Sequence, residues 1–427
     1  MRNNMRYRML KVNSDPDVTG FERSSESVSH SLSLRYAFQQ CRIAASMSRL
    51  STLVLSLILL LSSLSGCIGD LDESQNSDSD SGDNSNNDPN DRSDNDSANS
   101  TDNQSEENLV GREIECPDGS TTVVVWGEET CAIPEVFAAS DVSQDTVNLT
   151  LKWYGVGSTA WGNLGPIEIY IIGENISAAE ELEDEYCERH KALDDNWKEE
   201  WDCANENYRI FTDYVEGGGA AVSAFMKSYL DYDFTMLIMS AKFPGPEEED
   251  YKPVMLHEYF HVFQHAHIQD KCSGDSRDNC IRDEKMGGKN KPWFSEGGAE
   301  YMAQSLYAQQ PGVRDNYLRE VMEMKLNYSL EGYTSQDIRL DNLTYDSNVN
   351  VYDVGAWFIA FLIHNEGEST YREGFYGDLD ELGFDASFEK NFNATRTTYI
   401  EDFELFLEQP REEVMAIIPE QLPVNDS

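Results

Sequence analysis

Basic residues are scarce in this chain. Its 427 residues include 32 Lys and Arg against 79 Asp and Glu, which gives a formal net charge of −47. A surface of this sign repels the phosphates of nucleic acids and of anionic lipid headgroups, so DNA or RNA binding is excluded as a function. High solubility alone would also favour such an acidic surface, so the net charge does not indicate an activity.

The chain also lacks an apolar run long enough to span a membrane comfortably. Its longest run covers 50–61 and follows the positive residue Arg49. A short apolar run behind a positive residue is typical of a secretory signal. We interpret 47–66 as a signal peptide, and 1–46 as an upstream extension that is not translated if Met47 is the true start.

The end of this signal resembles the lipobox of lipoproteins, in which a cysteine becomes the lipidated first residue. The sequence there is Leu64-Ser65-Gly66-Cys67. A lipid on Cys67 would attach the protein to a membrane, and an uncleaved signal anchor is the alternative. Either arrangement predicts a cell-surface protein facing the exterior. The following 67–108 is almost entirely Asp, Ser, Asn and Glu, which predicts a disordered acidic tether because nothing in it can form a core.

No C-x-x-C pair occurs, which argues against zinc ligation by cysteine. Apart from Cys41 and Cys67, six cysteines remain, and they fall into sequence-adjacent pairs: Cys116 with Cys131, Cys187 with Cys203, and Cys272 with Cys280. In an exported chain this pattern indicates three disulfides, although the sequence does not decide the pairing. The first pair would close a small β unit at 109–135, which is either a separate microdomain or the first part of the following domain.

The pattern His257-Glu258-Tyr259-Phe260-His261 carries the clearest chemical signal. On a helix, residues four apart share a face, so His257 and His261 can offer two nitrogens to one metal ion with Glu258 beside them. A catalytic zinc ion needs a third protein ligand and an open position. We expect Glu296 to be this ligand, on a second helix that begins near Pro292 and approaches the first helix through Gly297 and Gly298.

The three stretches HExxH, W-x-x-E-G-x-A-E-Y (Trp293–Tyr301) and Y-x-x-G-A (Tyr352–Ala356), in this order, resemble those of the gluzincin metallopeptidases, the clan of thermolysin and aminopeptidase N. The resemblance covers about 235–406. It implies Zn²⁺ on His257, His261 and Glu296, Glu258 as general base, and Tyr352 as hydrogen-bond donor to the tetrahedral intermediate. The aminopeptidase motif G-x-M-E-N has no counterpart at 216–220, so aminopeptidase specificity does not carry over.

Other residues of the site have competing interpretations. Glu300, one turn beyond Glu296, is expected to accept the spare ring N–H of a zinc histidine; a solvated carboxylate or a third zinc ligand are the alternatives. His267 occupies the third-ligand position of the metzincin pattern, but Gln264 stands where that pattern has glycine, and a continuing helix would rotate His267 away. His265 either lines the cleft or is a surface histidine. His364, Trp293 and Trp357 are expected to serve packing.

Hydrophobic periodicity predicts the remaining elements. Strands are expected at 146–153, 166–172 and 235–240. The gluzincin resemblance implies that the last one lines the cleft and can pair with an extended peptide. Helices are expected within 177–215 and 217–230, and then at 313–326, 351–366, 387–392 and 399–408. The predicted fold is α+β: a gluzincin-like catalytic domain at 136–420, with a β-containing N-terminal half, a mostly α-helical C-terminal half, and the zinc helix in the cleft between them.

Together these patterns predict an extracellular, membrane-tethered zinc peptidase that hydrolyses peptide bonds with metal-activated water, and we expect an endopeptidase acting on peptides or proteins. One alternative is a non-catalytic cell-surface binding protein with a structural zinc ion. The other is a hydrolase of a different reaction class on the same scaffold. The sequence does not indicate the natural substrate or the oligomeric state.

Overall fold

A computed structural model describes residues 113–125, 127–193, 210–224, 235–242, 244–268, 285–288, 291–335, 338–420 and 422. All of them belong to one compact unit, Thr101–Ser427. The predicted signal, tether and upstream extension, as well as Cys203, Cys272 and Cys280, lie outside these residues. Of the helices that are described, none is both long and apolar enough to cross a bilayer.

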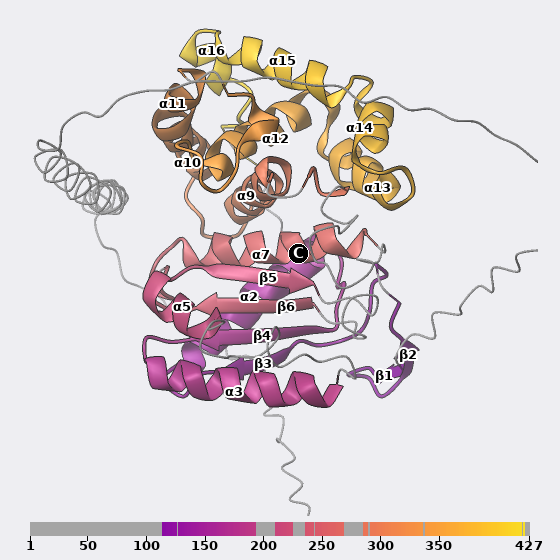
Figure 1. The fold of residues 1–427 in the computed structure, drawn as a ribbon, viewed down its shortest axis with the longest axis vertical. Helices are drawn as coiled ribbons and strands as arrows, with labels where there is room; N and C mark the ends of the chain where they lie inside the picture. The colour runs from indigo at the N-terminus through magenta and orange to yellow at the C-terminus, as the bar shows by residue number, and fades with distance from the viewer. Residues whose placement is uncertain are drawn as a thin grey trace, which may run out of the picture. The chain divides into compact units, whose positions relative to one another are not determined.

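A four-stranded mixed sheet forms the first half of the unit (Figure 1). Its spatial order is β3-β4-β6-β5, with bounds Glu135–Ala138, Ile167–Ile172, Thr235–Ser240 and Ala220–Ala224. The first three strands are parallel, whereas β5 runs antiparallel to β6 and ends the sheet. Every residue of β4 is buried, as expected for a strand covered on both faces.

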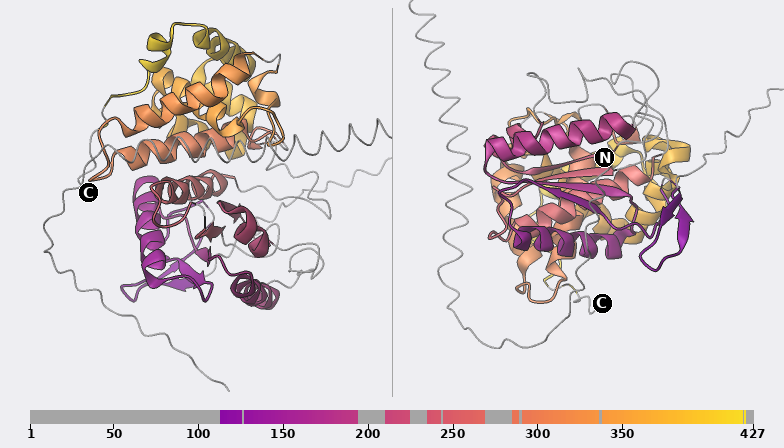
Figure 2. Two further views of the ribbon diagram at one scale, coloured as in Figure 1. Left: turned by 90° about the vertical axis from the view of Figure 1, so that its left-hand side faces the viewer. Right: turned by 90° about the horizontal axis from the view of Figure 1, so that it is seen from below.

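Helices cover both faces of this sheet (Figure 2). The odd-numbered isoleucines of β4, such as Ile169, belong to a core shared with α2 (Gln144–Trp161) and α7 (Tyr251–Ala266). Tyr170 and Ile172 point the other way, into a smaller core shared with α3 (Ile176–Leu193) and α5 (Ile210–Gly217). Successive strand residues face opposite sides, so one strand contributes to both cores.

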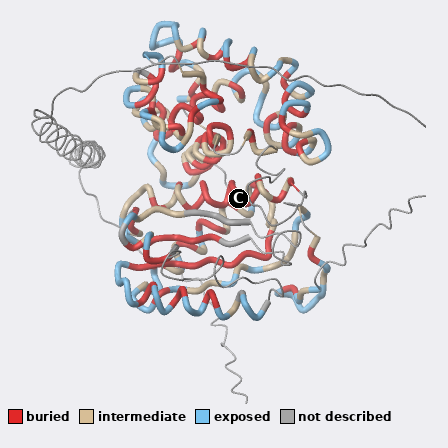
Figure 3. Tube along the Cα trace, viewed as in Figure 1, coloured by how far each residue is buried: buried red, intermediate tan, exposed pale blue. Residues whose placement is uncertain are grey.

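The HExxH helix α7 lies between the sheet and the helices that follow it in the chain (Figure 1). Pro253 in its first turn is compatible with helix because the N–H groups there have no intrahelical partner. Nearly the whole helix is buried, including His257, Glu258 and His261 (Figure 3). Polar side chains in such a position need partners, which makes them candidates for function.

The remaining elements are helical. They are α9 (Trp293–Ala308), α10 (Tyr317–Lys325), η2 (Leu326–Leu330), α11 (Glu331–Thr334), η3 (Leu340–Asn342), α12 (Val351–Glu366), η4 (Thr370–Phe375), α13 (Tyr376–Leu382), α14 (Phe384–Phe392), α15 (Arg396–Leu407) and α16 (Arg411–Met415). No strand follows α7 in the described part of the chain. The predicted α+β class, with a β-containing first half and an α-helical second half, is therefore confirmed at this level.

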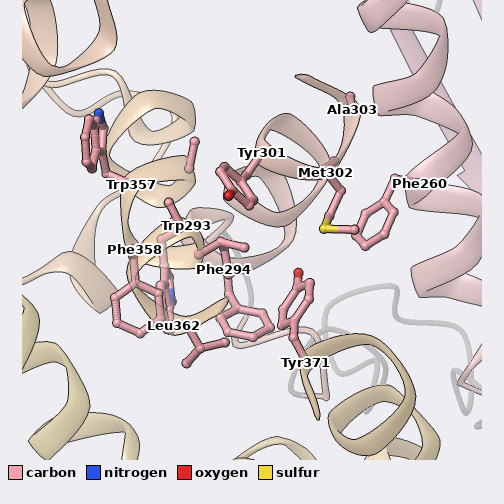
Figure 4. Packing of buried hydrophobic residues seen from close by; sticks show 14 of the residues in the cluster. Phe260, Trp293, Phe294, Tyr301, Met302, Ala303, Trp357, Phe358, Leu362 and Tyr371 are labelled. Carbon is pink, nitrogen blue, oxygen red and sulfur yellow. The ribbon is translucent and has the colours of Figure 1, made fainter. Parts of the chain in front are cut away.

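Two helices of the second half pack with their backbones in near contact. A Cβ atom added to Gly297 of α9 would lie 2.3 Å from the carbonyl carbon of Gly355 of α12. A Cβ atom added to Gly298 would lie 2.2 Å from the Tyr371 hydroxyl and 3.1 Å from the amide nitrogen of Gln264 in α7. Gly298 thus serves the predicted approach to the HExxH helix, whereas Gly297 serves the contact with α12. Aromatic side chains fill the space around this contact (Figure 4).

A disulfide between Cys116, which follows β1, and Cys131 ties the β1–β2 hairpin (Glu113–Glu115 and Thr121–Val123) to the segment before β3, and it joins one of the sequence-adjacent cysteine pairs. The Asn163 amide donates hydrogen bonds of 2.8 Å to the carbonyls of Thr130 and Ala132. The hairpin is thereby held against the segment after α2. Cys187 is also disulfide-bonded, and its predicted partner lies outside the described residues.

Two sequence predictions are wrong. The expected strand at 146–153 is part of helix α2, which Ser143 caps by accepting from the Thr146 N–H and whose buried residues recur at helical spacing. The expected helix at 217–230 is instead β5 where the structure describes it, because Gly218 and Gly219 at positive φ turn the chain and pairing with β6 overrides the helix propensity of alanine.

The strand that was expected to line the cleft and pair with a peptide is also predicted wrongly. The strand at 235–240 is present as β6, but β4 and β5 pair with its two edges, so it cannot pair with a peptide. Among the strands that the structure describes, β5 is the edge strand on this side of the sheet, and β3 on the other. The prediction names the wrong strand because a sequence shows strand propensity and not strand order.

The α9–α12 contact makes a stability prediction. Gly297→Ala should destabilise the protein by about 3 kcal/mol or more, because backbone of α12 occupies the new methyl position and overpacking typically costs ~1–3 kcal/mol. Gly155→Ala on α2 is the matched control: its methyl group would meet no neighbouring atom within 4 Å, so better helix propensity should stabilise by up to ~1 kcal/mol. Denaturant unfolding of both variants measures the difference, and equal effects would contradict the packing argument.

Candidate metal centre

Three side-chain atoms from two helices converge on one point. His257 Nε2 and His261 Nε2 of α7 lie 3.2 Å apart, and each is 3.1 Å from Glu296 Oε2 of α9. Tetrahedral zinc with bonds of about 2.0–2.1 Å would place its ligand atoms roughly 3.3–3.4 Å apart. The three predicted ligands therefore have the chemistry and nearly the spacing that zinc requires, and they could hold one ion.

The outer nitrogens of both histidines are occupied. His257 Nδ1 lies 3.1 Å from Glu300 Oε2, which is the contact predicted for Glu300. His261 Nδ1 lies 2.7 Å from Oε1 of Gln264, whose amide in turn donates to the Ser295 carbonyl. Because a carboxylate and an amide oxygen only accept, both Nδ1 atoms carry a hydrogen, and each Nε2 is the nitrogen that faces the common point.

Glu300 is itself held by a buried cation. Lys325 Nζ, at the end of α10, lies 2.7 Å from Glu300 Oε1 and 2.7 Å from Asp353 Oδ1 of α12. Asp353 also accepts a hydrogen bond from the Ser329 hydroxyl in η2. This chain of contacts connects His257 to α9, α10, η2 and α12, so the orientation of one candidate ligand depends on how these four segments pack.

At the candidate ligands, burial and the neighbouring charges shift the pKa values in opposite directions. Burial alone would lower the pKa of His257, but its contacts with Glu296 and Glu300 outweigh burial and raise the pKa to about 10. Burial would raise the pKa of Glu296, yet the two histidines hold it well below its usual value. Without a cation the site favours a proton on the histidines, so a metal ion must displace it.

Glu258 and Tyr352 border the same cleft, which has a volume of about 610 Å³. Burial raises the pKa of the Glu258 carboxyl, whereas the two histidines lower it.

Asn350 caps α12 by accepting from the Tyr352 N–H at 3.0 Å, which places Tyr352 in the first turn. Its ring lies 6.0 Å from that of His257. Burial and the nearby carboxylates raise the pKa of its hydroxyl, so it remains a hydrogen-bond donor.

Several residues of the site were not expected from the sequence. Tyr345 donates a hydrogen bond of 2.6 Å to Glu296 Oε1. Tyr214, with a pKa raised to about 12 by burial and by Glu258 and Glu296, lines the cleft together with Lys291. Lys325 and Gln264 support the histidines. The helix predicted at 313–326 includes Lys325, but no local pattern indicates what its ammonium group contacts.

The other histidines are placed as follows. His265 lines the cleft. His267 is the residue after α7; its Nδ1 lies 2.7 Å from the Phe263 carbonyl and its ring packs against Phe263 and Tyr376, so the metzincin alternative is wrong. Trp293 and Trp357 are fully buried, which agrees with their expected packing role. His364 is exposed on α12, so the expectation that it packs in the core is wrong.

Comparison with known proteins identifies neither a matching family model nor a similar curated protein.

The buried Lys325 contacts generate a prediction. Lys325→Met should destabilise the protein by roughly 3–5 kcal/mol, because it leaves the Glu300 and Asp353 carboxylates buried without their cation. Metal affinity should also fall by about 10- to 100-fold, because Glu300, which orients His257, loses the cation that holds it in place. Lys390→Met removes an exposed pair with Asp378 and should change stability by less than ~1 kcal/mol. Denaturant unfolding and metal titration test both variants; equal losses would exclude a special role for Lys325.

Proposed function

We propose that this protein is a zinc-dependent peptidase of the gluzincin type. The observation that carries the proposal is the convergence of His257 Nε2, His261 Nε2 and Glu296 Oε2 within 3.1–3.2 Å of one another, beside Glu258 and in an open cleft. Three protein ligands leave one coordination position of the ion open for water or substrate. In a structural zinc site, four protein ligands fill every position.

A bound zinc ion would supply Lewis acidity that polarises water and the substrate carbonyl. Glu258 accepts the proton of the attacking water and delivers it to the leaving amine. Its burial keeps it a stronger base than an exposed carboxylate, in spite of the adjacent histidines. Tyr352 donates a hydrogen bond to the oxyanion that develops on the substrate.

The edge strand β5 provides a place for the substrate backbone. Ala220, the first residue of β5, and Gly219 just before it line the cleft with the candidate ligands. An extended peptide could add to this edge through main-chain hydrogen bonds, which do not depend on the peptide's sequence. This supports action on extended segments of proteins or peptides, and an endopeptidase rather than an aminopeptidase.

The cellular location is part of the proposal. The disulfide between Cys116 and Cys131 and the disulfide-bonded Cys187 favour an oxidising compartment outside the cytoplasm. A lipid on Cys67, or an uncleaved signal anchor, would attach the enzyme to the membrane, with the acidic 67–108 as the tether.

Glu258→Gln tests the assigned base. Hydrolysis of a mixture of unfolded proteins should fall by roughly 10²- to 10⁴-fold, because the amide cannot take up the proton. Bound zinc should remain at wild-type level, since Glu258 is not among the three converging ligands. Glu389→Gln, an exposed carboxylate of α14, is the control and should leave turnover unchanged. Unchanged turnover in Glu258→Gln would refute the base, and a wild type that binds zinc without cleaving any substrate would favour a structural ion.

Glu296→Ala tests the third ligand. Zinc affinity should fall by more than the roughly 10- to 100-fold typical of an outer contact, because the ion loses a direct bond. Competition with a chelator and metal analysis of the purified protein measure this loss. Chelation of the wild type should abolish hydrolysis, and added zinc should restore it. Wild-type zinc content in Glu296→Ala would place the ion elsewhere.

A further inference from the structure

Tyr345 makes an unusual contact for a surface residue. The residue is 58% exposed and lies between η3 and α12. Its hydroxyl nevertheless donates a hydrogen bond of 2.6 Å to Glu296, whose side chain is only 12% exposed. A hydroxyl bonded to a carboxylate at this distance forms a strong, charge-assisted hydrogen bond.

This contact divides the two oxygens of Glu296 between different partners. Oε2 lies 3.1 Å from Nε2 of His257 and 3.1 Å from Nε2 of His261. Oε1 accepts from Tyr345. One oxygen therefore faces the point on which the histidines converge, and the hydroxyl holds the other.

The backbone around Tyr345 is fixed on both sides. Leu343 and Val349 are buried in the core. Between them the Thr344 N–H donates to the Ser347 hydroxyl at 2.8 Å, and the Ser347 N–H donates to the Thr344 carbonyl at 3.1 Å. The tyrosine ring also lies 6.1 Å from the ring of Tyr352. These contacts set the direction of the hydroxyl although the ring itself is exposed.

We propose that Tyr345 is a positioning residue that restricts Glu296 to binding the metal ion through one oxygen. A carboxylate can bind a cation through one oxygen or two, and the second oxygen would take a position that a catalytic zinc site keeps open. By holding Oε1, Tyr345 preserves that position for water or substrate. This inference rests on the metal site of the proposed function, but it does not require peptide cleavage.

Tyr345→Phe, which removes only the hydroxyl, tests the proposal in the Co²⁺-substituted protein. The visible absorption of Co²⁺ weakens as its coordination number increases, and five-coordinate sites are accessible to catalytic centres of this kind. We expect a clear loss of absorption intensity in Tyr345→Phe, while the ion remains bound. Turnover should fall by roughly 10- to 100-fold, in line with the loss of an outer contact.

Two variants serve as controls. Tyr328→Phe removes a hydroxyl from a tyrosine that is 59% exposed, and should leave the cobalt spectrum and turnover unchanged. Tyr352→Phe alters the tyrosine next to His257 and should lower turnover without changing the spectrum, because its assigned partner is the substrate.

The outcomes separate this inference from the proposed function. A wild-type cobalt spectrum in Tyr345→Phe overturns the positioning role, even if the enzyme cleaves peptides. A weakened spectrum supports it, even if no peptide is cleaved and the peptidase proposal fails. A wild type that binds neither Co²⁺ nor Zn²⁺ at these residues overturns both.

Discussion

The close approach of α9 to its neighbouring helices is the constraint on which the site depends. Glu296 reaches the two histidines only because Gly298 leaves room for Gln264 of α7 and for Tyr371, and Gly297 leaves room for the backbone of α12. The same approach brings Glu300 within 3.1 Å of His257. Packing of uncharged backbone therefore determines the distance between the charged groups that could hold an ion.

Once the helices are close, the buried charges must compensate one another. Glu296 faces two histidines, and Lys325 lies between Glu300 and Asp353. Each isolated charge would be strongly unfavourable at this depth, and a divalent cation would add the positive charge that balances Glu296 and Glu258. The supports of the two histidines also differ: His257 is held by an ion-paired carboxylate, whereas His261 is held by the neutral amide of Gln264. Of the two candidate ligands, the His257 ring is therefore both oriented and polarised by a charged partner, whereas the His261 ring is mainly oriented.

Local patterns predicted which side chains converge better than they predicted the topology. The spacing of His257 and His261 on one helix and the composition around Glu296 were enough to propose the ligands, since side chains one turn apart on a helix always share a face. The same approach misassigned α2 and β5. Threonine and valine in α2 suggested a strand, but a serine cap and burial at helical spacing made it a helix. The alanines of β5 suggested a helix, but pairing with β6 made it a strand. Propensity is a weak preference that tertiary contacts override.

By itself, the sequence determined the residue types of the candidate site, the helix that carries the two histidines and the α+β class. Each of these follows from residues close together in the chain, whose spacing limits what they can do. Tertiary structure alone decided that β5 is the edge strand, that Lys325 neutralises Glu300, and that the Tyr345 hydroxyl contacts Glu296. These contacts join segments that are far apart in sequence, and their geometry is set by how whole helices and strands pack rather than by any local pattern.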